Sequence, residues 1–135
     1  MNQGRVLLID DQPEHAEGLR CLLEEEGIQM RMESSAITLP FVVRSFDPDV
    51  ILLDLQMPGL SGTAIFAGDH HKRLRTAAPI ILFSGRDARE LSRLTEQLGA
   101  DGFLAKAQDA TDMIHRIHVW IKQRRAVESV QQRRN

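Results

Sequence analysis

Four short runs of consecutive apolar residues constrain the fold of this chain more than any other feature. Three are strongly apolar and the last is weaker: Val6–Ile9, Val50–Leu53, Ile80–Phe83 and Gly102–Ala105. Because apolar and polar residues do not alternate in these runs, each predicts a strand that is covered on both faces, as in a parallel sheet. A fifth segment, Ile28–Met32, does alternate, and its pattern predicts a strand at the edge of the sheet.

Helical patterns lie between these runs, so strands and helices alternate along the chain. Four of the predicted helices are well marked, and they begin near Pro13, Thr38, Asp87 and Thr111. Another, predicted from Ser61 or Gly62 to about Leu74, is weakened by Gly68 and by the polar stretch 69–71. Five strand–helix units predict an open, doubly wound α/β sheet with helices on both faces, because a closed barrel needs eight units and far more than 135 residues.

Polar residues stand where the buried strands end. Asp10 and Asp11 follow the first strand, Asp54 the second, Ser84 the third and Lys106 the last. The carboxyl ends of parallel strands share one edge, where ligands bind in open α/β sheets, so we expect these side chains to converge. Carboxylates this close raise one another's pKa unless a cation joins them, and hard oxygen ligands favour Mg²⁺. An ammonium and a hydroxyl suit an anionic oxygen, so the set fits phosphoryl transfer to a carboxylate.

Four pieces of the sequence, in this order and spacing, resemble the receiver domain of two-component response regulators: LLIDDQ, VILLDLQMPGLSG, IILFSGRD and GADGFLAKA. The resemblance extends to about Arg124 and implies a flavodoxin-like (βα)5 fold, a five-stranded parallel sheet of order 2-1-3-4-5. We expect residues 1–123 to form the receiver domain and residues 124–135 to be a polar C-terminal tail or the start of a linker. The chain departs from the family pattern at Ala107, which follows Lys106 in place of the usual proline, and at Pro40, which falls inside the second helical segment.

The resemblance also implies a role for each residue at the strand ends. Asp54 would be the phosphoacceptor, Asp11 would bind Mg²⁺ directly, and Asp10 would assist through water. Gln56 would offer its main-chain carbonyl to the metal, because the turn 57–59 bends the chain there. Lys106 would pair with the acyl phosphate.

Two further positions correspond to the family's conformational switch. Ser84 stands at its Ser/Thr switch position and Phe103 at its aromatic switch position. If Ser84 moves toward the phosphate, Phe103 can turn into the space that Ser84 leaves. The signal surface would then be the face made by the fourth predicted helix, the last strand and the last helix.

The resemblance implies a signalling domain that catalyses only its own phosphotransfer and dephosphorylation, with Mg²⁺ as cofactor. Its partners would be a sensor histidine kinase or phosphotransfer protein, and an output domain or downstream protein; homodimerisation is left open. The formal net charge of −2 argues against direct nucleic-acid binding. One cysteine and no long apolar run predict a cytoplasmic chain without membrane attachment.

Three alternative functions share part of this pattern. A phosphatase of the haloacid-dehalogenase type also uses a strand-end aspartate and Mg²⁺, but it needs a second aspartate where this chain has Gln56, and a substrate cap. A flavodoxin-like FMN binder needs a hydroxyl-rich phosphate loop, whereas Asp10 and Asp11 would repel the phosphate. The third is a pseudo-receiver that only binds partners, and nothing in the residue set requires it.

Several residues also have simpler explanations. Asp10 or Asp11 could merely cap the first helix. His70 and His71 are adjacent on a predicted helix, so we expect exposed side chains that point apart, with no metal role. We expect a trans peptide between Lys106 and Ala107, because without proline the cis form costs ~2.5–4 kcal/mol.

Overall fold

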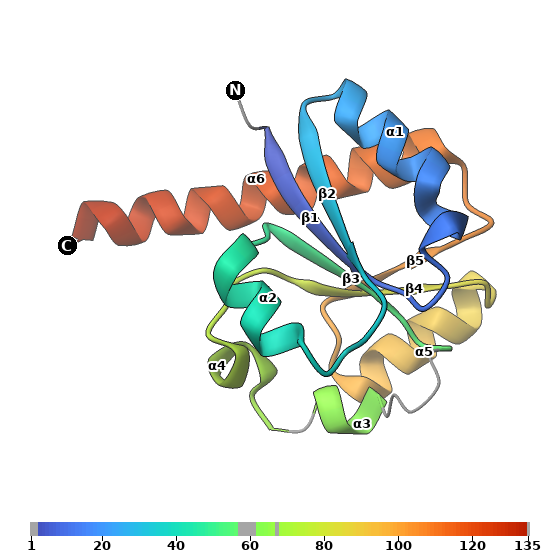
Figure 1. Ribbon diagram of the computed structural model, residues 1–135. Coiled ribbons are helices and arrows are strands. Elements are labelled where there is room, and N and C mark those ends of the chain that lie inside the picture. The colour runs from blue at the N-terminus through green and yellow to red at the C-terminus, as the bar shows by residue number, and fades with distance from the viewer. Residues whose placement is uncertain (1–2, 57–61, 67, 135) are drawn as a thin grey trace.

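Five parallel strands form one sheet in the order β2-β1-β3-β4-β5, which confirms the predicted flavodoxin-like, doubly wound arrangement (Figure 1). The computed structural model describes residues 3–56, 62–66 and 68–134. The strands are β1 (Gly4–Ile9), β2 (Ile28–Glu33), β3 (Val50–Asp54), β4 (Ile80–Ser84) and β5 (Gly102–Ala105). The alternating segment lies at the edge of the sheet as predicted, since β2 pairs with β1 and ends the strand order.

The consecutive apolar runs are explained by cores on both faces of the sheet. On one face, Val6 and Leu8 of β1 pack with residues of α1 (Glu17–Glu25) and α6 (Ala110–Arg134). On the other face, Leu7 and Ile9 pack in a cluster with residues of α2 (Leu39–Phe46) and α4 (His70–Leu74). These four β1 side chains are completely buried. Burying each of these side chains stabilises the fold by ~1.5–3 kcal/mol. This packing holds β1, and therefore the residues at its carboxyl end, in a fixed position.

The remaining helices begin and end at residues that the sequence marks. They are the 3₁₀ turn η1 (Pro13–Ala16), α3 (Gly62–Ile65) and α5 (Ala88–Leu98). Asp87 caps α5, because its carboxylate accepts the main-chain N–H of Glu90 at 2.8 Å. Gly99 follows α5 with a φ of 75°, a left-handed conformation that glycine adopts at low cost. Pro40 lies in the first turn of α2, where its missing N–H does no harm.

The helix predicted from Ser61 or Gly62 to Leu74 is wrong as a single element. α3 ends at Ile65 and α4 begins at His70. Between them Gly68 adopts a φ of 65°, and the carboxylate of Asp69 accepts the main-chain N–H of Lys72 at 3.1 Å, which starts a new helix. Ser61 itself lies outside the described residues.

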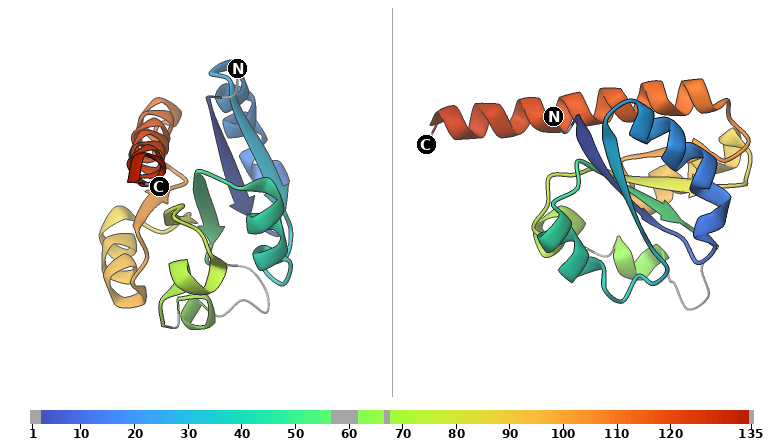
Figure 2. Two further views of the ribbon diagram at one scale, coloured as in Figure 1. Left: turned by 90° about the vertical axis from the view of Figure 1, so that its left-hand side faces the viewer. Right: turned by 45° about the horizontal axis from the view of Figure 1, so that its top comes forward.

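The last helix is long, and it continues through the segment that the sequence suggested as a tail or linker. α6 runs unbroken from Ala110 to Arg134 and extends beyond the sheet (Figure 2). Arg124 and Arg125 tie it to the loop before β3, with guanidinium nitrogens 2.9 Å from Asp47 and 3.1 Å from Asp49. Where the receiver domain ends along α6 stays a prediction. None of the described helices combines the length and the apolar character that crossing a membrane requires.

Candidate functional site

Three carboxylates meet at the carboxyl ends of β1 and β3. Asp10 and Asp11 follow β1, Asp54 is the last residue of β3, and one oxygen of each lies within 4.8 Å of the others. Asp10 and Asp54 are only 1% and 4% exposed, whereas Asp11 is open to solvent. Two carboxylates of the cluster are therefore buried at the ends of the strands, and solvent reaches the cluster from the side of Asp11.

Main-chain amides orient the two buried carboxylates. Gln12 donates its N–H to Oδ1 of Asp10, and Gln56 donates its N–H to Oδ1 of Asp54, both at 2.9 Å. Each amide lies two residues after its carboxylate, so the turn that follows each strand holds the side chain in place. In both residues the other oxygen, Oδ2, then faces Lys106.

The ammonium of Lys106 lies between these two oxygens. Its Nζ is 3.3 Å from Oδ2 of Asp10 and 3.4 Å from Oδ2 of Asp54, and it lies 5.3 Å from the centroid of the Phe83 ring. The main-chain N–H of Lys106 donates to the carbonyl of Ser84 at 2.7 Å, which extends the β4–β5 pairing to the lysine. The peptide to Ala107 is trans, as predicted.

Acidic groups outnumber basic groups in this cluster. Burial raises the pKa of the Asp54 carboxyl and Asp10 adds to the rise, while the amide of Gln56 and the charge of Lys106 oppose it. The cluster brings together three carboxyl groups, and the ammonium of Lys106 lies 3.3 and 3.4 Å from oxygens of two of them. Such a set favours a divalent cation, and its carboxylate oxygens are ligands that suit Mg²⁺.

The other predicted site residues surround the carboxylates at different depths. Ser84 ends β4, is 1% exposed, and its Oγ accepts the N–H of Arg86 at 3.2 Å. Gln56 is exposed, two residues after the end of β3. Phe103 is half-buried on β5, with the guanidinium of Arg116 5.5 Å from its ring centroid. The turn 57–59, which was expected to direct the carbonyl of Gln56, lies outside the described residues.

The prediction that the adjacent histidines point apart is wrong, and the prediction that both are exposed is wrong for His70, while His71 is half-exposed. His70 is only 8% exposed, and the ring centroids of His70 and His71 are 4.4 Å apart. Both Nε2 atoms approach the same oxygen of Asp101. Helical spacing alone could not reveal this, because the convergence depends on where α4 begins and on a carboxylate 30 residues further on.

Similarity to known proteins extends over most of the chain. A family model described as the response regulator receiver domain matches residues 6–118. The chain is similar to the sensory transduction protein RegX3 of Mycobacterium tuberculosis, at 31% identity over 87% of this chain and 50% of the relative. It is also similar to the cell cycle transcriptional regulator CtrA of Caulobacter vibrioides, at 30% identity over 87% of this chain and 50% of that protein. The chain thus spans about half the length of these relatives.

Solved structures extend the similarity to three dimensions. The receiver domain of the Francisella response regulator 1452 superposes with a TM-score of 0.73 at 25% identity, covering 89% of this chain and 98% of the other. The signal receiver domain of the putative response regulator NarL from Mycobacterium tuberculosis gives 0.71 at 26% identity, covering 90% and 98%. Both similarities span almost the whole sheet and its helices.

Proposed function

Because this chain belongs to the family of response regulator receiver domains, we propose that it accepts a phosphoryl group on Asp54 in a Mg²⁺-dependent reaction. The donor would be a sensor histidine kinase or a phosphotransfer protein. The observation that carries the proposal is the position of Asp54, a buried carboxylate within 4.8 Å of two other carboxylates and 3.4 Å from an ammonium.

The donor atoms at this site fit Mg²⁺. Asp11 is open to solvent beside two buried carboxylates, so a bound ion could keep waters, as Mg²⁺ usually does. Asp11 would ligate the ion directly, Asp10 through water, and Gln56 through its main-chain carbonyl. When bound, the ion would supply charge neutralisation at the phosphoryl oxygens.

The other roles in phosphoryl transfer would belong to groups of the chain itself. The amide of Gln56 holds Oδ1 of Asp54, which leaves Oδ2 to form the new bond to phosphorus as the donor's bond to phosphorus breaks. Lys106, already 3.4 Å from this oxygen, would pair with a phosphoryl oxygen, and Ser84 would donate its hydroxyl to another. Positioning and charge compensation are most of what phosphoryl transfer requires. Gln56 provides no carboxylic general acid, which argues against a haloacid-dehalogenase-type phosphatase.

The output would pass from Ser84 to the adjacent strand. Ser84 pairs with Ala105 across the β4–β5 ladder, and Phe103 lies on β5 two residues earlier. A movement of Ser84 toward the phosphate would therefore bias the rotamer of Phe103 and the contact of Arg116 with its ring. The surface of α5, β5 and α6 would carry the signal to an output domain or a downstream protein.

Intact-mass measurement after incubation with acetyl phosphate tests the proposed function. We expect one added phosphoryl group on the wild-type chain with Mg²⁺, and none with EDTA. Asp54→Asn, which keeps the shape of the side chain but removes the nucleophile, should remain unlabelled. Glu96→Gln, an exposed carboxylate of α5, is the matched control and should label like wild type. Equal labelling of Asp54→Asn would overturn the assignment.

A further inference from the structure

A second cluster of potential ligand atoms lies at the amino ends of the strands, whereas Asp54 lies at their carboxyl ends. Asp101 directly precedes β5, and its Oδ2 accepts the main-chain N–H of Ile80, the first residue of β4, at 2.8 Å. This carboxylate is therefore fixed at the amino ends of two strands. Nε2 of His71 lies 2.8 Å from the same oxygen and Nε2 of His70 lies 3.5 Å from it.

The packing of α4 makes this convergence of adjacent residues possible. His70 is the first residue of α4, and its ring packs edge-on against Phe66, with ring centroids 5.1 Å apart. The ring of His71 tilts by 42° against that of His70. Both imidazoles therefore lean toward one carboxylate, and all three ligand atoms lie within 4.8 Å of one another.

Both ring nitrogens of His71 face oxygens that accept hydrogen bonds. Nδ1 lies 3.1 Å from the carbonyl oxygen of Thr76, and Nε2 lies 2.8 Å from Oδ2 of Asp101. A neutral imidazole carries one N–H, so it can donate to only one of these two oxygens. If Nδ1 donates to Thr76, the lone pair of Nε2 faces the carboxylate and is free to ligate a metal ion. A ring that donates Nδ1–H to a carbonyl and presents Nε2 is the usual state of a metal-ligating histidine.

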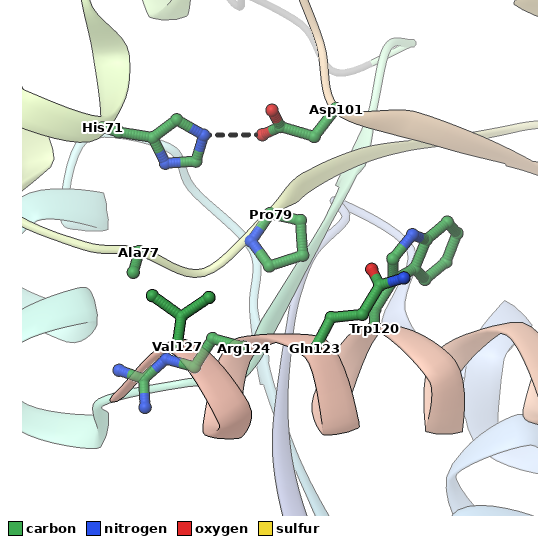
Figure 3. Close-up of a pocket in the computed structure, with 8 residues that line it drawn as sticks. All are labelled: His71, Ala77, Pro79, Asp101, Trp120, Gln123, Arg124 and Val127. Carbon is green, nitrogen blue, oxygen red and sulfur yellow. Dashed lines mark hydrogen bonds and ion pairs between the residues drawn. The ribbon is translucent and has the colours of Figure 1, made fainter. Parts of the chain in front are cut away.

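Two of the three residues, His71 and Asp101, line a pocket, whereas His70 is buried. Figure 3 shows His71 and Asp101 at one side of a pocket of about 250 Å³, with Trp120 and Gln123 of α6 also lining it. The side chains of His71 and Asp101 are 32% and 31% exposed, so an ion could reach them. Three protein ligands would leave a coordination position for water or a small anion from the pocket.

We propose that His70, His71 and Asp101 bind a divalent transition-metal ion of the Zn²⁺ class. Two imidazole nitrogens and one carboxylate suit Zn²⁺, Co²⁺ or Ni²⁺, whereas the all-carboxylate cluster around Asp54 suits Mg²⁺. The histidine-containing cluster at the amino ends of the strands therefore suits a different metal from the carboxylate cluster at their carboxyl ends. A bound ion would join α4 to the start of β5, the strand that carries Phe103.

Co²⁺ is the probe, because its open d shell quenches tryptophan fluorescence and Trp120 is the only tryptophan in the chain. Untagged protein is titrated with Co²⁺ in excess Mg²⁺, which occupies the carboxylate cluster. We expect saturable one-to-one quenching, and recovery of the fluorescence when Zn²⁺ displaces Co²⁺. Zn²⁺ should also raise the Tm of the wild-type chain.

Variants assign the site. His71→Ala and Asp101→Asn should each weaken Co²⁺ binding at least about tenfold, and Asp101→Asn keeps an oxygen that can still accept the N–H of Ile80. His115→Ala and His118→Ala, in histidines outside the cluster, and Asp54→Asn should bind as wild type does. If wild type shows no saturable quenching and no Zn²⁺-dependent Tm, the cluster is a His–Asp ion pair only and the proposal is overturned. Equal binding by Asp101→Asn, or loss in the His115 or His118 variant, would overturn it as well.

Discussion

At the scale of single residues, the burial of Asp54 affects the stability of the fold as well as the proposed phosphorylation. Burial raises its pKa in the folded chain, and the nearby Asp10 adds to the rise. An acid with a higher pKa in the folded state than in the unfolded state binds protons more tightly when folded, so its ionisation lowers the free energy of unfolding. This loss is complete above the folded-state pKa and is relieved as the pH falls toward the unfolded-state value.

We predict that Asp54→Asn stabilises the metal-free chain at neutral pH by on the order of 1 kcal/mol, because it removes a buried charge that also lies beside Asp10. The gain over wild type should shrink as the pH is lowered, since wild-type Asp54 then becomes protonated in the fold. Mg²⁺ should also reduce the gain, because the cation relieves the same repulsion. Urea unfolding in EDTA, at several pH values, measures the difference, and Glu96→Gln should show no such dependence. A variant less stable than wild type at neutral pH would contradict this account.

The sequence could predict the strand-end residues but not the histidine cluster. Asp10, Asp54 and Lys106 follow apolar runs directly, and a parallel sheet must bring such positions to one edge. The approach of His70 to Asp101 depends instead on the end of one short helix, the start of another and a loop before β5. No periodicity in the sequence encodes that arrangement.

At the scale of elements, Gly68 separates α3 from α4. Its φ of 65° lies in the left-handed region, where a side chain is strained, although no atom of the described residues lies within 4 Å of an added Cβ. We predict that Gly68→Ala lowers the free energy of unfolding by about 1–2 kcal/mol through the backbone alone. Gly18→Ala is the matched control: it lies inside α1, also with open space at Cβ, and should stabilise by about 0.5–1 kcal/mol. Chemical denaturation measures both, and equal effects of the same sign would refute the assigned backbone strain.

The interruption at Gly68 also shows the limit of sequence patterns for elements. The strands, the Asp87 cap and the position of Pro40 were all predictable, because each rests on a strong local preference. The third helix was predicted as one element from Ser61 or Gly62 to about Leu74, although Gly68 and the polar stretch 69–71 weakened the pattern. The tertiary contacts of Phe66 and Leu74, both buried in the core, hold the two short helices separately.

At the scale of the whole molecule, the proposed phosphorylation site and the expected signal surface belong to one continuous set of elements. β4 carries Ser84, β5 carries Phe103, and α6 carries Arg116, whose guanidinium lies 5.5 Å from the Phe103 ring centroid. The paired strands β3, β4 and β5 therefore connect Asp54 to Phe103, and the ring of Phe103 contacts α6 through Arg116.

We predict that beryllofluoride, a phosphoryl mimic, with Mg²⁺ shifts backbone amide resonances from about Ser84 to Ile117, in addition to those beside Asp54. The reason is that Ser84 and Phe103 respond together while the cores on the two faces stay packed. Two-dimensional amide spectra of the wild-type chain measure the effect, and Asp54→Asn serves as the control without shifts. Shifts restricted to α1 and α2 would contradict this path.

The most direct test of the central claim locates the phosphoryl group itself. The chain is phosphorylated with acetyl phosphate and Mg²⁺, reduced with borohydride, which converts an aspartyl phosphate to homoserine, and digested for peptide mass analysis. The account predicts homoserine at position 54 and unmodified aspartate at positions 10 and 11, because Asp54, the last residue of β3, stands at the position that the family resemblance assigns to the phosphoacceptor. Homoserine at another position, with position 54 unmodified, would contradict it.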